Sequence, residues 1–176
     1  MEENIIVPTN IAYSSCILQG NIEQLRKEYT FLRTGNIGYS VLGKPIPYIQ
    51  IGNGEKEVMY SSSIHANEWI TSVLLMKFVE DFSKAYKNND FIYGYNAREI
   101  FNKAKIYIIP MLNPDGVDLV TGVIRENTGV YNNFKDISLN FPNIPFPSGW
   151  KANFNGVDFS NFQHTLLINR LDWRLL

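Results

Sequence analysis

The chain has 176 residues, of which 45% are apolar and 14% aromatic, which is enough to build the core of one domain and excludes a disordered chain. Its 16 basic and 17 acidic side chains give a formal charge of −1, so there is no electrostatic reason to expect nucleic acid or an anionic membrane as a partner. We therefore expect a small or peptidic partner.

Cysteine content and the amino terminus bear on the cellular compartment. Cys16 is the only cysteine, which excludes an internal disulfide and a thiolate metal cluster, and we expect it to be a small core residue. The first ten residues, MEENIIVPTN, lack the basic and apolar regions of a secretory signal. No run approaches the roughly 18 apolar residues that a membrane span requires. The chain as given is expected to be cytoplasmic, unless an upstream segment is missing.

The first predicted elements are a helix and a hairpin. From about residue 14 to 29, apolar residues recur at helical spacing and charged residues cover the other side, which predicts a surface helix. Residues 38–51, GYSVLGKPIPYIQI, are predicted to form a hairpin that turns at Gly43 and Lys44. The prolines in its second strand favour a position at the edge of a sheet.

A strand, two helices and a second strand are predicted next. Residues 57–64 are a short strand, 68–88 a helix with one broad apolar stripe, 97–103 a second helix, and 105–110 an apolar strand of the kind buried on both faces. This order is typical of the βαβ unit of a mostly parallel sheet with helices on its faces. Residues 131–147 are expected to be a long loop and receive no assignment.

The stretch SSIHANEWIT places His65 three residues before Glu68, where the predicted strand becomes a helix. Ligands bind beyond the carboxyl ends of parallel strands, and residues 111–116, MLNPDG, end the next strand at the same edge. Zinc hydrolases need imidazole and carboxylate ligands that converge and leave a position for water. From the spacing alone a second interpretation stays open, in which His65 bonds a carbonyl and Glu68 faces the helix dipole.

Three segments resemble the M14 zinc carboxypeptidase family, in the same order and at similar spacings: His65 with Glu68, residues 113–116 (Asn-Pro-Asp-Gly) and residues 156–158 (Gly-Val-Asp). Residues 150–153 (Trp-Lys-Ala-Asn) look nearest to the bacterial γ-D-glutamyl-diaminopimelate peptidases, which cut peptidoglycan stem peptides. The resemblance implies an α/β fold with a mixed, mostly parallel twisted sheet flanked by helices. It also implies one zinc ion (Zn2+) held by two histidines and a glutamate.

The resemblance assigns roles to particular residues. Carried over position by position, it implies that His65 and Glu68 are metal ligands. Lys151 stands where the family usually places an arginine that polarises the scissile carbonyl, and a lysine supplies the charge without the bidentate fork. In the family, the segment that here ends at Asp158 introduces substrate-binding residues.

Beyond Asp158 the resemblance fails. The family usually continues with an asparagine and often an arginine that receive the terminal carboxylate of the substrate, where this chain has the uncharged Ser160 and Asn161. This difference fits an endopeptidase or a γ-glutamyl specificity better than a strict carboxypeptidase. The third zinc ligand of the family is a later histidine and its general base a later glutamate, but His164 comes too early and no glutamate follows it.

These departures predict an incomplete domain. We expect residues 1–158 to be the amino-terminal part of an M14 peptidase domain and residues 159–176 to be a tail that does not match the family. The tail would result from a truncation or a frameshift near residue 159. With neither a third ligand nor a general base, the chain alone is expected to be inactive.

The leading interpretation is a zinc metallopeptidase that hydrolyses peptide or γ-D-glutamyl-diaminopimelate bonds, with a peptide or a stem peptide as its partner. A zinc deacylase acting on N-acyl amino acids would share the His-x-x-Glu pattern. A peptide- or glycan-binding remnant would keep the cleft without turnover. A decayed reading frame without function is the third alternative.

Overall fold

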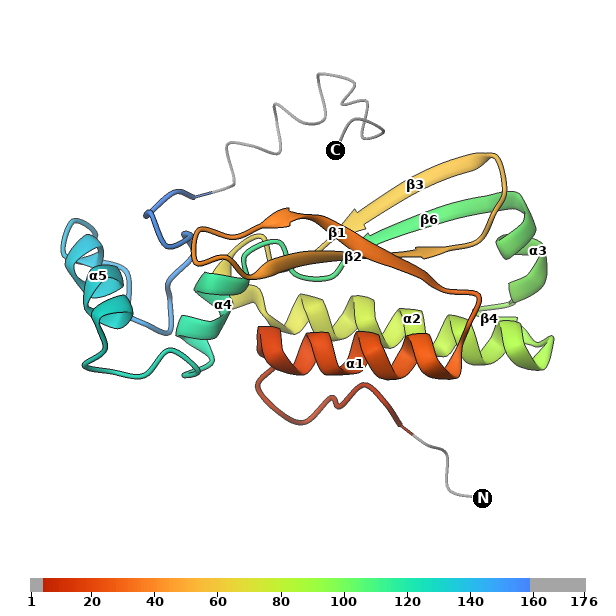
Figure 1. The fold of residues 1–176 in the computed structure, drawn as a ribbon, viewed down its shortest axis with the longest axis horizontal. Coiled ribbons are helices and arrows are strands. Elements are labelled where there is room, and N and C mark those ends of the chain that lie inside the picture. The colour runs from red at the N-terminus through yellow and green to blue at the C-terminus, as the bar shows by residue number, and fades with distance from the viewer. Residues whose placement is uncertain (1–4, 159–176) are drawn as a thin grey trace.

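The computed structural model describes residues 5–158 (Figure 1). Its helices are α1 (Ser15–Glu28), the single 3-10 turn η1 (Ala66–Glu68), α2 (Ile70–Asn88), α3 (Ala97–Lys103), α4 (Pro114–Val120) and α5 (Gly129–Ser138). Its strands are β1 (Arg33–Tyr39), β2 (Pro45–Ile51), β3 (Lys56–Ser61), β4 (Phe91–Ile92), β5 (Tyr95–Asn96) and β6 (Ala104–Ile109). Within this part of the chain, no helix combines the length and apolar character that crossing a membrane requires.

Four strands form one mixed sheet in the order β1-β2-β6-β3. The β1–β2 hairpin and the β2–β6 pair are antiparallel, whereas β3 and β6 are parallel. The chain between β3 and β6 contains α2, the small β4–β5 hairpin and α3. The expected α/β fold with a mixed sheet is therefore confirmed, and its parallel part is the predicted βαβ unit.

The position of the prolines corrects one prediction. The hairpin forms as expected, but the strand that contains Pro45 and Pro47 is β2, which lies between β1 and β6 and not at an edge. β6 pairs with β2 only from Ile49 to Ile51. The prolines lie outside that stretch, so β6 does not require an N–H from either of them.

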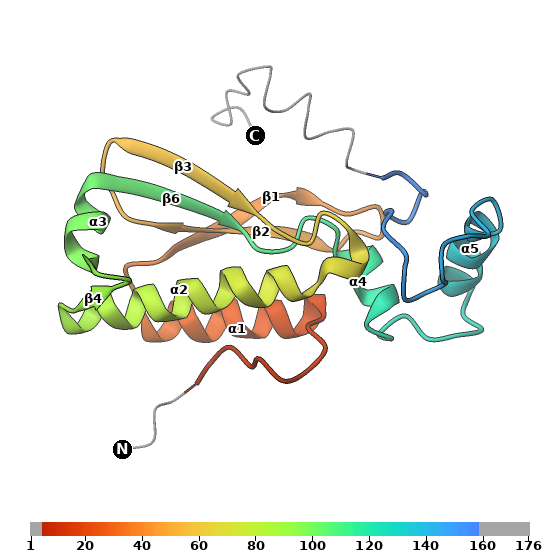
Figure 2. The same ribbon diagram turned by 180° about the vertical axis from the view of Figure 1, so that it is seen from behind.

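Helices α1 and α2 lie side by side on one face of the sheet (Figures 1 and 2). The core between these two layers consists of fully buried apolar side chains, among them Leu18, Leu25, Ile49, Ile51, Met76, Phe82 and Ile108. Burying one such side chain stabilises the fold by roughly 1.5–3 kcal/mol. Cys16 is not part of this core, because it is exposed on α1.

A buried carboxylate on α2 holds the N-terminal strap, which we define as residues 5–8. Glu80, whose exposed fraction is 0%, accepts the backbone N–H groups of Ile6 at 2.9 Å and Val7 at 3.3 Å. Burial alone would raise the pKa of the Glu80 carboxyl. The Ile6 N–H and the ammonium groups of Lys77 and Lys84 outweigh burial, and the pKa is lowered.

Helix α5 builds a second, smaller core within the stretch that was expected to be a loop. This core consists of Ala66, Leu119, Tyr131, Phe134, Trp150 and Ala152. The ring of Phe134 meets those of Trp150 and Phe154 edge to face, with centroids 6.3 and 5.1 Å apart. Because Ala66 follows His65, this core fixes the surroundings of the predicted metal ligands.

Candidate metal centre

The chain leaves β3 through a strained turn at Ser63, whose φ of 46° lies in the left-handed region. The N–H of Ser63 donates to Thr71 Oγ1 at 2.9 Å, and its hydroxyl lies 2.5 Å from that of Ser72. Such a backbone conformation costs on the order of 1–3 kcal/mol and persists only where its surroundings hold it. Here the first turn of α2 holds it and directs the chain into His65.

His65 and Glu68 face each other across η1. Nδ1 of His65 is 2.9 Å from Oε1 of Glu68. Two ligand atoms on one tetrahedral zinc ion lie about 3.3 Å apart. The Glu68 side chain is 47% exposed, so its carboxylate can move away from the imidazole by the small difference between the observed 2.9 Å and the distance that zinc requires. The chemistry and spacing of this donor pair therefore fit a zinc ion.

Asp158 lies on the opposite side of the imidazole ring. Its Oδ1 is 3.4 Å from Nε2 of His65. With a metal ion bound at Nδ1, the proton of the imidazole would lie on Nε2 and face Asp158. Sequence reasoning missed this contact and assigned Asp158 to a substrate-binding segment. The Gly-Val-Asp motif was the only feature of the sequence that pointed to Asp158. No local pattern relates His65 and Asp158, because they lie far apart in the chain.

A tight turn presents Asp158 to the histidine. The side-chain oxygen of Asn153 accepts the N–H groups of Asn155 and Val157, both at 3.0 Å. Gly156 has a φ of +74°, and a Cβ atom there would lie 2.7 Å from Cγ2 of Ile137 on α5. Only glycine satisfies both the conformation and the space, so the turn is fixed against α5.

Lys151 is joined to the site through its backbone. Its carbonyl oxygen accepts the N–H of Ala66 at 3.0 Å and the Nδ2 group of Asn113 at 3.2 Å. Its side chain is exposed. The backbone thus fixes Lys151 beside the residue that follows His65, while its side chain stays exposed to solvent.

Asn113, which the sequence placed in one of the three segments that resemble the family, joins three parts of the chain at the site. Its Oδ1 caps α4 by accepting the N–H of Gly116 at 3.1 Å, and its Nδ2 also donates to the carbonyl of Ala152 at 3.1 Å. Its own N–H donates to the carbonyl of Ser63 at 3.1 Å. The residue is 2% exposed. It therefore ties α4, the turn after β3 and the Lys151 segment together.

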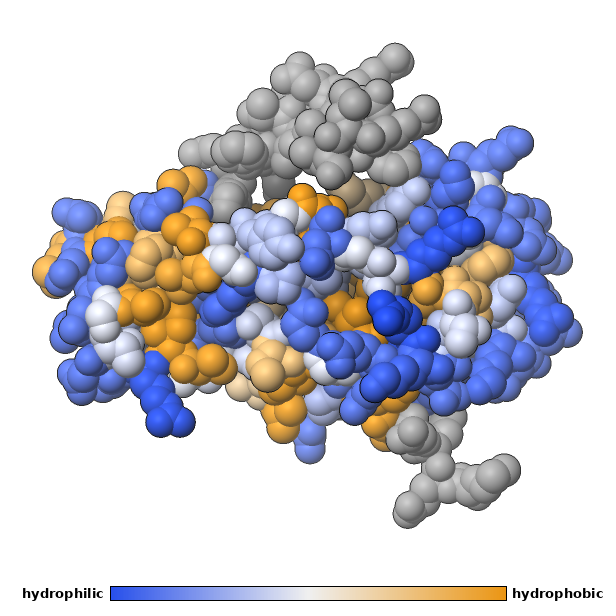
Figure 3. Space-filling view, in the orientation of Figure 1, coloured by the Kyte–Doolittle hydropathy of each residue, from blue (hydrophilic) through white to orange (hydrophobic). Residues whose placement is uncertain are grey.

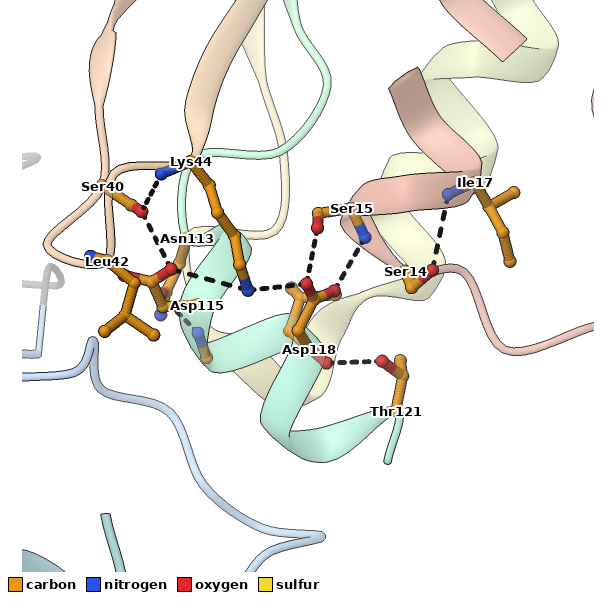
Figure 4. A network of polar contacts seen from close by, with 12 residues as sticks. Ser14, Ser15, Ile17, Ser40, Leu42, Lys44, Asn113, Asp115, Asp118 and Thr121 are labelled. Carbon is orange, nitrogen blue, oxygen red and sulfur yellow. Dashed lines mark hydrogen bonds and ion pairs between the residues drawn. The ribbon is translucent and has the colours of Figure 1, made fainter. Parts of the chain in front are cut away.

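Two buried aspartates on α4, Asp115 and Asp118, connect that helix to the rest of the fold (Figure 4). Asp115 accepts the hydroxyl of Ser40 in the hairpin turn at 2.8 Å. Asp118 accepts the N–H of Ser15 at 2.8 Å and the ammonium of Lys44 at 2.6 Å. These carboxylates hold α1 and the hairpin turn in place, so their role is in the scaffold.

The described residues offer two candidate ligands and no complete metal site. Within residues 5–158, no group of three or more His, Cys, Asp and Glu side chains is arranged to hold an ion. The predictions for Ser160, Asn161, His164 and the tail of residues 159–176 fall outside the described residues. The roles of His65, Glu68 and Lys151 stay predictions.

A hollow of about 410 Å³ lies elsewhere, beside the hairpin turn. Its lining residues are Leu42, Lys44, Asp118, Val123, Ile124, Arg125, Thr128 and Val130. Apolar side chains gather on the surface at this end of the molecule (Figure 3). Since His65, Glu68 and Lys151 are not among the lining residues, the hollow is not a cleft over the predicted site.

One protein family matches most of the chain. The family model for zinc carboxypeptidases, Peptidase_M14, matches residues 19–164. The chain therefore belongs to the M14 zinc carboxypeptidase family.

Two curated relatives match most of this chain. The chain is 42% identical over 149 residues to gamma-D-glutamyl-L-diamino acid endopeptidase 1 of Lysinibacillus sphaericus, a match that covers 85% of this chain and 37% of the relative. It is 31% identical over 150 residues to the uncharacterized protein YqgT of Bacillus subtilis (strain 168), covering 84% and 39%. The chain thus spans less than two fifths of the length of these relatives.

Solved structures support the fold. The bovine thrombin-activatable fibrinolysis inhibitor, in its complex with tick carboxypeptidase inhibitor, aligns with a TM-score of 0.58 and 18% identity. The alignment covers 82% of this chain and 38% of that chain. At this level of identity the likeness concerns the fold alone, and it agrees with the expected M14-like arrangement of helices and sheet.

Proposed function

We propose that this chain carries part of the catalytic site of a zinc-dependent peptidase that hydrolyses γ-D-glutamyl bonds to diamino acids in peptidoglycan stem peptides. The observation that carries the proposal is the His65 imidazole held between Glu68 at 2.9 Å and Asp158 at 3.4 Å. The 42% identity to a γ-D-glutamyl-L-diamino acid endopeptidase supports the choice of substrate.

In this proposal His65 and Glu68 hold the zinc ion. The ion would supply a Lewis acid that activates water and polarises the substrate carbonyl. Asp158 keeps the proton of His65 on Nε2, so that Nδ1 is available as a ligand atom. Catalytic zinc sites use three protein ligands, and the described residues offer two, so the chain alone is expected to bind zinc weakly and to show little turnover.

Lys151 is proposed to bind the scissile carbonyl and to stabilise the negative charge that develops on its oxygen. Its backbone carbonyl accepts the N–H of Ala66, which places the Lys151 backbone beside the residue that follows His65. The ammonium acts as a single point charge, so the substrate must be oriented by other groups as well. Removing one group of this kind typically lowers kcat by about 10²–10³-fold.

A chimeric enzyme tests the proposed function. The matched segment of the Lysinibacillus endopeptidase is replaced by the corresponding residues of this chain. Release of the diamino acid from a γ-D-glutamyl-diaminopimelate peptide is then measured beside hydrolysis of an N-acyl amino acid. We expect hydrolysis of the first substrate only. His65→Ala should abolish it, and Lys151→Ala should reduce it about 10²–10³-fold.

The matched control is Val123→Ala, because Val123 is 50% exposed and is not part of the predicted site. This variant should keep the activity of the chimera. A folded chimera that hydrolyses neither substrate, or an active one that tolerates His65→Ala, would contradict the proposal. Activity on the N-acyl amino acid alone would instead identify a deacylase.

A further inference from the structure

The first turn of α2 carries two hydroxyl side chains that reach back out of the helix. The N-cap of α2 is Trp69, whose side chain makes no capping hydrogen bond, and Thr71 and Ser72 lie inside the helix. Serine and threonine at the start of a helix usually bind the free N–H groups of its first turn. Here both hydroxyls instead contact the turn that leads from β3 to the candidate ligands.

Thr71 binds the main chain on both sides of the candidate ligand pair. Its Oγ1 accepts the N–H of Ser63, two residues before His65, at 2.9 Å. The same hydroxyl donates to the carbonyl oxygen of Glu68 at 2.7 Å. One hydroxyl can donate and accept at the same time, so the two bonds form together. The chain that enters the His65–Glu68 segment and the chain that leaves it are thus held on one oxygen atom.

The conformation of Ser63 depends on such contacts. Ser63 is 1% exposed and has a φ of 46°, a backbone conformation that serine adopts at a cost and glycine does not. Its hydroxyl lies 2.5 Å from that of Ser72 and 3.4 Å from the carbonyl oxygen of Glu68. The bond from its N–H to Thr71 offsets the cost. Without that bond the backbone before His65 would relax, and the imidazole would lose its fixed position relative to Glu68.

Thr128 shows what the same pair of bonds does when its role is structural. Its hydroxyl donates to the carbonyl of Arg125 at 2.8 Å and accepts the N–H of Tyr131 at 3.2 Å. Thr128 is the N-cap of α5 and lines the hollow beside the hairpin turn. Removing the hydroxyl of Thr71 or of Thr128 therefore breaks one bond to a carbonyl and one bond from an N–H. Only the bonds of Thr71 enclose the candidate ligands.

We propose that Thr71 is a positioning residue that sets the separation of His65 and Glu68 for a zinc ion. It acts through the main-chain groups of Ser63 and Glu68. The inference rests on the proposed function, because it takes His65 and Glu68 as the zinc ligands. It adds a residue that holds the pair in place before the ion binds. Groups that orient metal ligands in this way typically contribute about 10–100-fold in metal affinity or activity.

The zinc affinity of the full 176-residue chain tests the inference. Competition with a chromophoric chelator is measured for the unaltered chain, Thr71→Val, Thr71→Ser and Thr128→Val, with His65→Ala as the background of other zinc binding. Valine keeps the shape of threonine without its hydroxyl, whereas serine keeps the hydroxyl. We expect Thr71→Val to weaken the affinity about tenfold or more, and the other two to stay within about twofold of the unaltered chain.

Two further measurements separate positioning from a general loss of stability. The amide of Ser63 should exchange its hydrogen faster in Thr71→Val and keep its rate in Thr128→Val, although both variants lose a similar amount of thermal stability. In the chimera with zinc in excess, Thr71→Val should lower kcat about tenfold and change KM by less than about twofold. Thr71→Ser should retain both constants.

Circular dichroism establishes that each variant folds, and Thr71→Ala takes the place of Thr71→Val if the valine variant does not. The inference is overturned if the chain binds no zinc above the His65→Ala background, or if Thr71→Val and Thr128→Val have the same affinity. The expected order of affinities together with a chimera that hydrolyses no γ-D-glutamyl peptide supports the positioning role and contradicts the proposed function. An active chimera that is indifferent to Thr71→Val gives the reverse result.

Discussion

The hydrogen bonds of Asn113 join α4, the turn after β3 and the Lys151 segment around the candidate centre. We expect Asn113→Ala to lower the free energy of unfolding by about 2–3 kcal/mol, because the buried carbonyl of Ala152 loses the Asn113 donor, the Lys151 carbonyl keeps only the N–H of Ala66, and α4 loses its cap. Chemical denaturation measures the loss. Asn133→Ala is the control, since that side chain makes one exposed bond to a carbonyl at 3.3 Å. Equal losses for the two variants would contradict this role.

Glu80 makes stability depend on pH. Its pKa is lowered relative to the unfolded value of about 4.3, so its stabilisation is complete above that pH and disappears as the pH falls through the lower folded pKa. We expect Glu80→Gln to lose about 2 kcal/mol at pH 7 and to show a smaller change of stability with pH in the acid range.

Thermal unfolding across the acid range checks the Glu80 prediction. The control is Glu99→Gln, because Glu99 is 67% exposed and pairs only at the surface with Lys103. The Glu99→Gln variant should show the same change of stability with pH as the unaltered chain. A Glu80→Gln variant with that same profile would show that Glu80 is not the group responsible.

At the scale of elements, α4 and η1 approach closely because Gly116 has no side chain. A Cβ atom there would lie 2.7 Å from that of Ala66 and 2.8 Å from the carbonyl oxygen of Ala152. We expect Gly116→Ala to destabilise the protein by about 1–3 kcal/mol through overpacking and to shift the NMR signals of His65. In contrast, Gly20→Ala in α1, where a Cβ meets nothing within 4 Å, should stabilise it by up to about 1 kcal/mol. If both Gly116→Ala and Gly20→Ala destabilise the protein, or if neither does, close packing at Gly116 does not account for the effect of the substitution.

Elements with a strong local pattern could be predicted from the sequence. Helix α3 has the predicted bounds, and α1 and α2 follow the predicted apolar stripes. Helix α5 could not be predicted, because Asn132 and Asn133 are weak helix formers and its buried face contacts Trp150, which a local pattern does not reveal. Cys16 was assigned to the core from residue type alone, and the structure exposes it.

The sequence could predict those parts of the candidate centre that involve residues close together in the chain. The spacing of His65 and Glu68 suggested that the two side chains meet, and they are 2.9 Å apart. The contact of Asp158 with His65 and the bonds of Asn113 to the Lys151 segment depend on the tertiary fold. No periodicity or spacing within one element could have indicated them.

At the scale of the whole molecule, the described chain has two cores. One lies between the sheet and the helices α1 and α2, and the other surrounds Trp150. Trp150 is 2% exposed, so Trp150→Ala should remove about 3–5 kcal/mol from the smaller core. We expect faster hydrogen exchange in residues 129–138 and little change in β6. Faster exchange throughout the sheet would show that the two cores unfold as one unit.

The way Glu80 binds the N-terminal strap limits which residues can occupy positions 6 and 7 in natural variants of this protein. Glu80 binds the strap through main-chain groups, so different apolar residues at positions 6 and 7 would preserve both bonds. A proline at either position would remove a donor and leave one oxygen of the buried carboxylate with only a lysine ammonium as its partner. Natural variants should therefore carry isoleucine, valine or leucine at these two positions and exclude proline from both.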